Sequence, residues 1–156
     1  VKTVFSKHQA GQLAKVTLKK VRTRLPKLEY DFVNSPDLAQ TLVVTCVMMG
    51  VPFYFKGLSS LRIKETDRIE ALKKEMAKLG FVLREMAEGE LSWDGMRCRP
   101  TGEAIDTYED HRMALAFAPV ALVNKEIKIN QPGVVSKSYP QFWNDLIQSG
   151  FEINET

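Results

Sequence analysis

Three segments of the sequence share one pattern, in which a helical stretch ends at a glycine and an apolar residue follows at once. The junctions read GVPF from Gly50, GFVL from Gly80 and GFEI from Gly150. Glycine is a common stop just past a helix, because it enters the left-handed conformation without a steric penalty. The apolar residues after each stop predict strands. Helices and strands therefore alternate in short units, which indicates an α/β or α+β fold. The repeat is weak, and internal duplication and common punctuation explain it equally well.

Helices are predicted at four ranges of the chain: 36–49, 66–79, 109–122 and 140–149. Ser35 is a candidate N-cap for the first helix, and Pro36 suits its first position. Pro119 lies inside the third helix and is expected to kink it or end it early. Strands are predicted at 1–8, 14–24, 28–32, 81–86, 96–100, 126–130 and 151–154, with turns at 9–12 and 88–90, and residues 51–63 are read as a strand followed by a short strand or turn.

Composition places the chain among ordinary globular proteins. It has 156 residues, of which 44% are hydrophobic, enough for one domain or two small ones. Its net charge of +3 is too mild to indicate nucleic acid. The aromatic residues also do not interleave with the basic ones, as stacking on bases would require.

Two further features bear on where the protein acts. The longest apolar run, residues 41–55, is shorter than a membrane span and contains Gly50 and Pro52, and no signal peptide is visible at the start. Cys46 and Cys98 lie far apart without metal-ligand spacing, which favours reduced thiols in the cytoplasm. Because the chain opens at Val1 in a strand-like run, we expect it to be part of a longer protein.

Charged residues gather where the helices are predicted to start. The second helix carries a core stripe of residues 69, 72, 76 and 79, yet its start is loaded with charge. The side chains concerned are Asp37 at the first helix, Lys64, Glu65 and Arg68 at the second, His111 and Arg112 at the third, and Lys137 before the fourth. Basic groups at a helix start cost about 0.3–1 kcal/mol, but they strengthen a site for a phosphate or carboxylate. If the starts converge, they form a pocket for anions.

Each of these residues also has an ordinary explanation when taken alone. Lys64 and Lys137 would be solvated lysines, His111 a structural histidine and Asp37 a first-turn acid. Arg68 would pair with Asp67 or Glu65 on the surface. Only the recurrence at several helices favours a functional reading. The sequence contains no glycine-rich phosphate loop and no zinc-ligand spacing, so nucleotide and metal mechanisms lose support.

Two segments, LRIKETDRIEALKKEMAKLG and DTYEDHRMALAFAPVAL, resemble the enolpyruvyl transferase family, specifically the members that act on shikimate 3-phosphate. SPDLAQT and VVSKSYPQFW are similar to further family segments in the same order. The resemblance implies that residues 1–156 are a single domain, the C-terminal portion of a longer enzyme. In that enzyme, repeated helix–strand units form two domains with the active site between them. The N-terminal domain would then be absent from this chain.

The resemblance also implies a reaction. Phosphoenolpyruvate would give its enolpyruvyl group to the 5-hydroxyl of shikimate 3-phosphate, and phosphate would leave after an addition and an elimination. The reaction belongs to aromatic amino acid biosynthesis and needs no metal or organic cofactor. A stand-alone anion-binding module with the same fold is the alternative, and a nucleic-acid-binding domain ranks lowest.

The roles implied by the resemblance fall on the charged residues already named. Asp37 would hold and deprotonate the hydroxyl, Glu65 would protonate the methylene of phosphoenolpyruvate, and His111 would position Glu65. Lys64 would contact shikimate 3-phosphate, Arg68 and Arg112 would grip the carboxylate of phosphoenolpyruvate, and Lys137 would lie near the leaving phosphate. Ser60 stands where many members have Asn, which puts a substrate contact there in doubt.

A charge count sets a limit on what the chain can do. The two substrates together carry roughly −5 to −6. The four cations and two carboxylates among these site residues sum to only +2. We therefore expect the chain to be inactive without the cations of the N-terminal domain.

Overall fold

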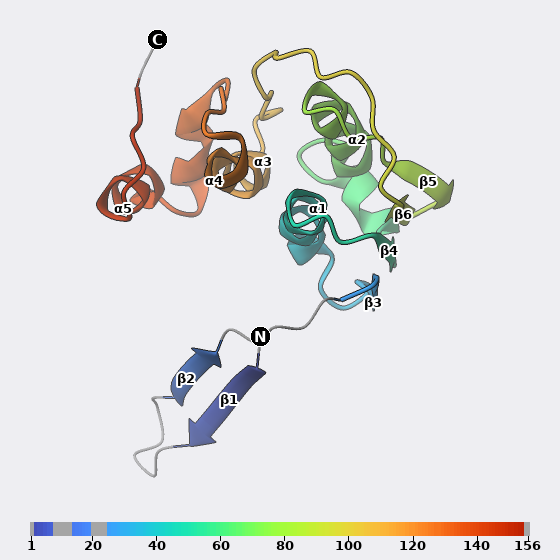
Figure 1. Ribbon diagram of the computed structural model, residues 1–156, viewed down its shortest axis with the longest axis horizontal. Coiled ribbons are helices and arrows are strands. Elements are labelled where there is room, and N and C mark those ends of the chain that lie inside the picture. The colour runs from blue at the N-terminus through green and yellow to red at the C-terminus, as the bar shows by residue number, and fades with distance from the viewer. Residues whose placement is uncertain (1, 8–13, 20–24, 155–156) are drawn as a thin grey trace.

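A computed structural model of the protein describes residues 2–7, 14–19 and 25–154 (Figure 1). The first two strands, β1 (Lys2–Lys7) and β2 (Ala14–Lys19), pair antiparallel as a two-stranded sheet. Both lie within predicted strands. The turn predicted at residues 9–12 and the end of the second predicted strand, at 20–24, lie outside the described residues.

The main sheet has four strands in the order β3 (Leu28–Asp31), β4 (Phe53–Lys56), β6 (Glu90–Trp93) and β5 (Arg84–Ala87). β3 and β4 are parallel, whereas the other neighbours are antiparallel. Parallel neighbours need a crossover connection. Helix α1 (Ala39–Met48) supplies it, so α1 starts beyond the carboxyl end of β3.

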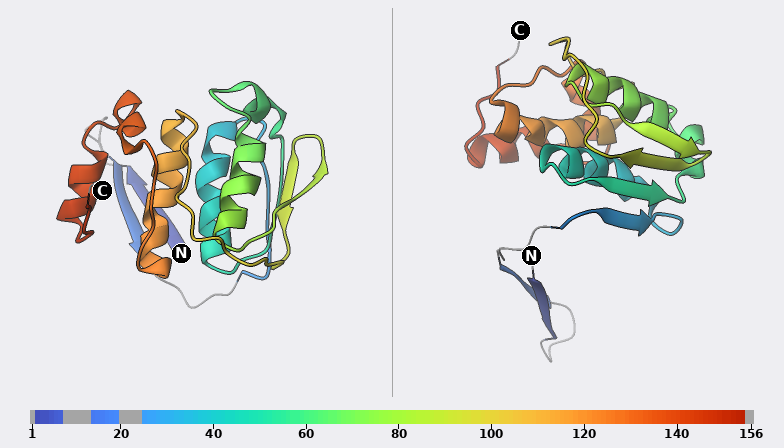
Figure 2. Two further views of the ribbon diagram at one scale, coloured as in Figure 1. Left: turned by 90° about the horizontal axis from the view of Figure 1, so that it is seen from above. Right: turned by 45° about the vertical axis from the view of Figure 1, so that its right-hand side comes forward.

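Eight further helical segments complete the described fold, which confirms a mixed α/β class. The longest is α2 (Arg68–Lys78), and the others are η1 (Pro36–Leu38), η2 (Ser59–Ile63), α3 (His111–Phe117), η3 (Ala118–Val120), α4 (Ala121–Asn124), η4 (Pro132–Lys137) and α5 (Phe142–Gln148). Figure 2 shows α1 between α2 and α3, with the three helices side by side. Helices α1 and α2 lie against the four-stranded sheet (Figure 1).

The core lies between these helices and the sheet. Phe53 and Phe55 of β4 stack with ring centroids 4.4 Å apart, and both are fully buried. From α2, Ile69, Leu72 and Met76 are also fully buried, which confirms the predicted stripe. A smaller cluster packs η4 and α5 against α3 through Ala114, Ala118, Val135 and Phe142.

The helix ends follow local signals, with two corrections. In the third predicted helix, α3 stops at Phe117, before Pro119, as expected, and the 3₁₀ turn η3 and the short helix α4 follow it. Ser35 was expected to cap the first helix, but its side chain makes no capping hydrogen bond, and a 3₁₀ turn precedes α1 instead. Helix α2 begins two residues later than predicted, because the Asp67 side chain accepts hydrogen bonds from the backbone N–H groups of Ile69 and Glu70.

Three predicted strands are wrong for the described residues. Residues 96–100 contribute only an isolated bridge between Arg97 and Phe81, and residues 126–130 only one between Ile129 and Ile105. Residues 151–154 form no strand. Alternation of apolar and polar residues gives a segment a strand pattern, but a ladder also needs a neighbouring strand. The strand after the turn at 88–89 is β6, at residues that sequence reasoning left in the turn and the connection.

Cys46 is buried and Cys98 is exposed, and both are free thiols, as expected for reduced cysteines. Of the helices in the described ranges, none has the length and apolar content needed to cross a lipid bilayer.

Candidate active site

The candidate site forms where three predicted helix starts converge. Asp37 lies in η1, the turn that follows β3 and leads into α1. Lys64 and Glu65 lie between η2 and α2, in the connection that follows β4, and Arg68 is the first residue of α2. Arg112 lies in the first turn of α3. Because β3 and β4 are parallel, both connections leave the same edge of the sheet, the usual place for ligand sites in such folds.

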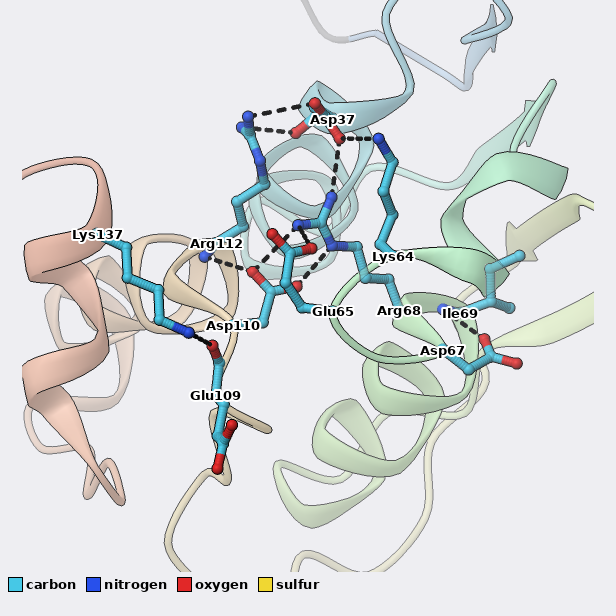
Figure 3. A network of polar contacts seen from close by, with 10 residues as sticks. All are labelled: Asp37, Lys64, Glu65, Asp67, Arg68, Ile69, Glu109, Asp110, Arg112 and Lys137. Atoms are coloured by element: carbon cyan, nitrogen blue, oxygen red, sulfur yellow. Dashed lines mark hydrogen bonds and ion pairs between the residues drawn. The ribbon is translucent and has the colours of Figure 1, made fainter.

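Arg68 is the centre of the cluster, with a side chain that is only 1% exposed (Figure 3). Its guanidinium binds carboxylates from three chain segments. The distances are 2.8 Å from Nη1 to Asp37 Oδ1, 2.7 Å from Nη2 to Glu65 Oε2 and 2.5 Å from Nε to Asp110 Oδ2. A buried guanidinium with three carboxylate partners has nearly all of its fork satisfied. Of the two surface partners considered from the sequence, Glu65 is a real contact. Asp67 caps the helix instead.

Asp110 is the residue of this cluster that sequence reasoning missed. Its side chain is fully buried, and its Oδ1 accepts a hydrogen bond of 2.8 Å from the backbone N–H of Arg112. It is therefore both the N-cap of α3 and a partner of Arg68. An aspartate directly before the basic residues of a helix is an N-cap signal that could have revealed it.

The other two cations of the cluster, Lys64 and Arg112, lie beside Asp37. Lys64 Nζ lies 3.6 Å from its Oδ1, and Arg112 Nη2 lies 3.3 Å from its Oδ2. Arg112 also donates to the backbone carbonyl of Asp37 at 3.2 Å. Burial alone would raise the pKa of Asp37, but the charges of Arg112, Lys64 and Arg68 outweigh it and hold that pKa below its ordinary value. Asp37 is therefore ionised at neutral pH.

Acid is expected to destabilise the protein partly through Asp37. A carboxylate with a lowered pKa stabilises the fold fully above its unfolded-state pKa of about 3.9, and this contribution disappears as pH falls through the folded-state pKa. In Asp37→Asn, the free energy of unfolding should therefore fall less steeply than in the parent between about pH 4 and pH 2. Denaturant titrations at several pH values measure both slopes. Identical slopes would contradict this account.

Glu65 and His111 come together as predicted. One ligand atom of each lies within 4.8 Å of the other and of a carboxylate oxygen of Asp110. Such a trio can hold a metal ion, but both carboxylates already bind Arg68, so their charge is largely neutralised. The Nδ1 atom of His111 is buried without a hydrogen-bond partner in the described part of the protein. Thus His111 adjoins Glu65, and none of the described residues holds its Nδ1 by a hydrogen bond.

Lys137 stands apart from the ion pairs of this cluster. Its Nζ donates a hydrogen bond of 2.8 Å to the backbone carbonyl of Glu109, the residue before Asp110 (Figure 3). Lys137 ends η4, which packs against α3. The predicted site residues are thus brought together except for Lys137, which contacts the turn before α3. Ser60, in η2, is exposed.

The connection that carries Lys64 and Glu65 is held at both ends by arginines. Arg62 Nη1 lies 2.5 Å from Asp67 Oδ2, and its Nη2 binds Glu85 of β5. The hydrogen bonds that Arg62 donates to Glu85 and Asp67 raise the pKa of Arg62, which stays charged. Arg62, just before the connection, therefore binds Asp67, just after it. Arg68 binds Glu65 within the connection.

The cations and carboxylates of the cluster nearly balance in charge. Three cations, Lys64, Arg68 and Arg112, face three carboxylates, Asp37, Glu65 and Asp110, so the cluster is close to neutral. Asp37 and Glu65 are 39% and 40% exposed, whereas Asp110 is fully buried. The arrangement places two accessible carboxylates and two accessible cations around one buried arginine. An anion can therefore replace a carboxylate on Lys64 or Arg112 without displacing Arg68 from Asp110.

Comparison with known proteins decides the family. A protein-family model described as EPSP synthase (3-phosphoshikimate 1-carboxyvinyltransferase) matches residues 9–146. This chain belongs to the EPSP synthase family. The resemblance inferred from the sequence is thereby confirmed. The two segments that carried it, residues 61–80 and 106–122, meet in space through the Arg68–Asp110 pair.

The similar EPSP synthases are considerably longer than this chain. A 3-phosphoshikimate 1-carboxyvinyltransferase of Bacteroides fragilis strain YCH46 is 58% identical over 139 residues, which cover 88% of this chain and 34% of that enzyme. Enzymes of the same name from Burkholderia ambifaria and Vibrio atlanticus are each 36% identical, over 121 and 126 residues, which cover 78% of this chain. The alignments cover 28% of each of these two enzymes. The chain thus spans about a third of the length of the relatives it matches.

Proposed function

We propose that this chain supplies part of the active site of an enzyme that transfers the enolpyruvyl group of phosphoenolpyruvate to the 5-hydroxyl of shikimate 3-phosphate and releases phosphate. The observation that carries the proposal is the cluster around Arg68, in which accessible acids and accessible cations adjoin a family-specific pair of segments. The relatives are called 3-phosphoshikimate 1-carboxyvinyltransferases, a name that agrees with this reaction.

The addition step needs one acid and one base, and the cluster offers a candidate for each. Glu65 in its protonated form gives a proton to the methylene carbon of phosphoenolpyruvate. The shikimate hydroxyl oxygen then bonds to the neighbouring carbon, and Asp37 accepts the hydroxyl proton. In the elimination, the bond from that carbon to the phosphate oxygen breaks. Phosphate leaves with one proton, which balances the proton that Asp37 accepted and returns Asp37 to its ionised form, and the new methyl group returns one proton to the Glu65 carboxylate. Positioned groups of this kind contribute about 10²–10⁴-fold each.

Substrate binding also tunes Asp37. In the free protein, Arg112 and Lys64 lower the pKa of Asp37, which makes it a weak base. The carboxylate of phosphoenolpyruvate competes for Arg112, and the phosphate of shikimate 3-phosphate competes for Lys64. Each exchange removes a cation from Asp37, and its pKa rises toward the range in which a carboxylate accepts a proton efficiently. The arginine fork suits the carboxylate, because it offers two parallel donors.

The near-neutral cluster supports the view that the rest of the enzyme is needed. The substrates bring roughly −5 to −6, and Lys137 adds only one positive charge to a balanced cluster. Asp110, unforeseen from the sequence, lowers the net charge further. We therefore propose that residues 1–156 are one domain of a cytoplasmic enzyme and that an N-terminal domain provides the missing cations.

The isolated chain is expected to show no measurable turnover, whereas the full-length enzyme turns over. A phosphate-release assay with both substrates measures each protein. Calorimetric titration of the isolated chain with phosphoenolpyruvate provides the second measurement, because a stand-alone anion-binding module would bind it tightly without the other domain. Substantial turnover by the isolated chain would contradict the need for a second domain.

A further inference from the structure

A second buried polar centre lies on α2, two turns beyond Arg68. The Glu75 carboxylate is fully buried and has three partners. It accepts hydrogen bonds from the Tyr108 hydroxyl at 2.6 Å and from the Asp106 backbone N–H at 3.0 Å, and it pairs with Lys78 Nζ at 2.7 Å. A buried carboxylate with three partners is strongly ordered, because any partner lost leaves charge unsatisfied.

Through Tyr108, this centre contacts an unusual turn in the backbone. Tyr108 and the next residue, Glu109, both have left-handed conformations, with φ of 53° and 56°. Non-glycine residues in that region are strained and persist only where the surroundings fix them. Asp110 and His111 follow directly, so the direction in which the turn leaves Glu109 sets where α3 begins.

The turn has side-chain contacts at both of its left-handed residues. The Tyr108 hydroxyl is bound to Glu75, and the Glu109 carbonyl is bound to Lys137. The Asp110 N–H donates to the carbonyl of Thr107 at 2.8 Å, which closes the turn on itself. The Glu75 contact joins Tyr108 to α2, the helix that also carries Arg68, and Lys74 Nζ of the same helix lies 5.7 Å from the centroid of the Tyr108 ring. Burial and the hydrogen bond to Glu75 raise the pKa of Tyr108, so its phenol keeps the donated proton at neutral pH.

We propose that Glu75 and Tyr108 are positioning residues that hold the left-handed turn before α3 and thereby set the placement of His111 and Arg112 in the site. Helix α2 then fixes α3 at two points, through Arg68 to Asp110 and through Glu75 to Tyr108. The inference rests on the proposed function, since it assigns the pair a role in presenting substrate-facing groups. In this proposal both residues act through the turn and not by direct contact with the substrate.

Tyr108→Phe tests the proposal, because it removes one hydroxyl and keeps the ring. Tyr54→Phe is the matched control: the Tyr54 hydroxyl also donates 2.6 Å to a glutamate, Glu90, but within the sheet. The first measurement is the NMR signal of the His111 ring in the 156-residue chain, which has only one other histidine, His8. We expect this signal and the amide exchange of residues 110–112 to change in Tyr108→Phe and not in Tyr54→Phe.

The second measurement is kinetic and uses the full-length enzyme. Tyr108→Phe is expected to lower kcat/KM for phosphoenolpyruvate by roughly 10- to 100-fold, since displacements of about 1 Å have effects of this size. The KM for shikimate 3-phosphate should change far less, which a general loss of stability would not produce. Glu75→Gln should reproduce the same selectivity.

Two outcomes would overturn the proposal. The first is that the His111 signal of Tyr108→Phe is unchanged. The second is that this signal changes but kcat/KM for phosphoenolpyruvate in Tyr108→Phe is no lower than in the control, Tyr54→Phe. If the unaltered full-length enzyme shows no turnover, the proposed function fails by itself. The NMR comparison then decides separately whether the pair holds the turn.

Discussion

Replacing Arg68 by Gln is expected to lower the free energy of unfolding of this chain by about 3–5 kcal/mol. Arg68 is buried, and it is the cation that neutralises the fully buried carboxylate of Asp110. Glutamine cannot supply a positive charge, so the substitution removes the ion-pair partner of the buried Asp110 carboxylate. A loss of this size is a large part of the 5–15 kcal/mol typical of a folded domain. Urea unfolding followed by circular dichroism measures it.

A control and a rescue variant separate this cause from general damage. Arg84→Gln removes an arginine of similar size that pairs with Asp94 on the surface, and should change stability by no more than about 1 kcal/mol. Combining Arg68→Gln with Asp110→Asn removes both buried charges and should recover part of the loss, so that the two changes are not additive. A single variant as stable as the parent would show that Asp110 does not depend on Arg68.

The sequence alone predicts the opposite sign for this substitution. A positive charge in the first turn of a helix opposes the helix dipole, so its removal would stabilise the chain by about 0.3–1 kcal/mol. That estimate treats Arg68 as an exposed side chain. Burial with three carboxylates makes the ion pairs the larger effect, and a role in ligand binding is no longer needed to explain why the residue is there.

In the full-length enzyme, Asp37→Asn is expected to lower turnover by about 10²–10⁴-fold while shikimate 3-phosphate binding weakens far less. Asparagine keeps an oxygen that accepts from Arg68, but it cannot take the hydroxyl proton. Steady-state rates and substrate titrations of the same preparation provide the comparison.

Asp31→Asn is the matched control for this prediction. Asp31 is a similarly exposed aspartate, at the end of β3, that also faces a lysine, Lys56, at 3.6 Å. It lies outside the cluster, so both turnover and affinity should stay near those of the parent. Equal losses of rate and affinity in Asp37→Asn would assign Asp37 to binding alone.

Local signals predicted much of the fold. The glycine stops, the apolar stripe of α2 and Pro119 each act through a few neighbouring residues, so the helices could be placed to within a few residues. The failed strands, residues 96–100, 126–130 and 151–154, have the right alternation. Strand formation also depends on a neighbour that the segment itself does not encode.

The candidate site was predictable as a set of residues but not as a set of contacts. Recurring charge at the helix starts, together with the two family segments, identified Asp37, Lys64, Glu65, Arg68, His111 and Arg112. Asp110 was missed because its partner, Arg68, is 42 residues away in the chain. The hydrogen bond between Lys137 and the Glu109 carbonyl depends on the left-handed backbone of Tyr108 and Glu109. The residues that usually mark such a conformation in a sequence, glycine and asparagine, do not stand at these two positions.

The triple contact of Arg68 has a consequence for how the chain opens. Its guanidinium joins Asp37, 31 residues earlier, to Asp110, 42 residues later. If either segment detaches, a charge buried on Arg68 or Asp110 loses its partner, so fraying of one helix start weakens the hold on the others. The three starts should therefore exchange their amide protons as one cooperative unit, with similar opening free energies, instead of loosening in turn as unconnected surface turns do.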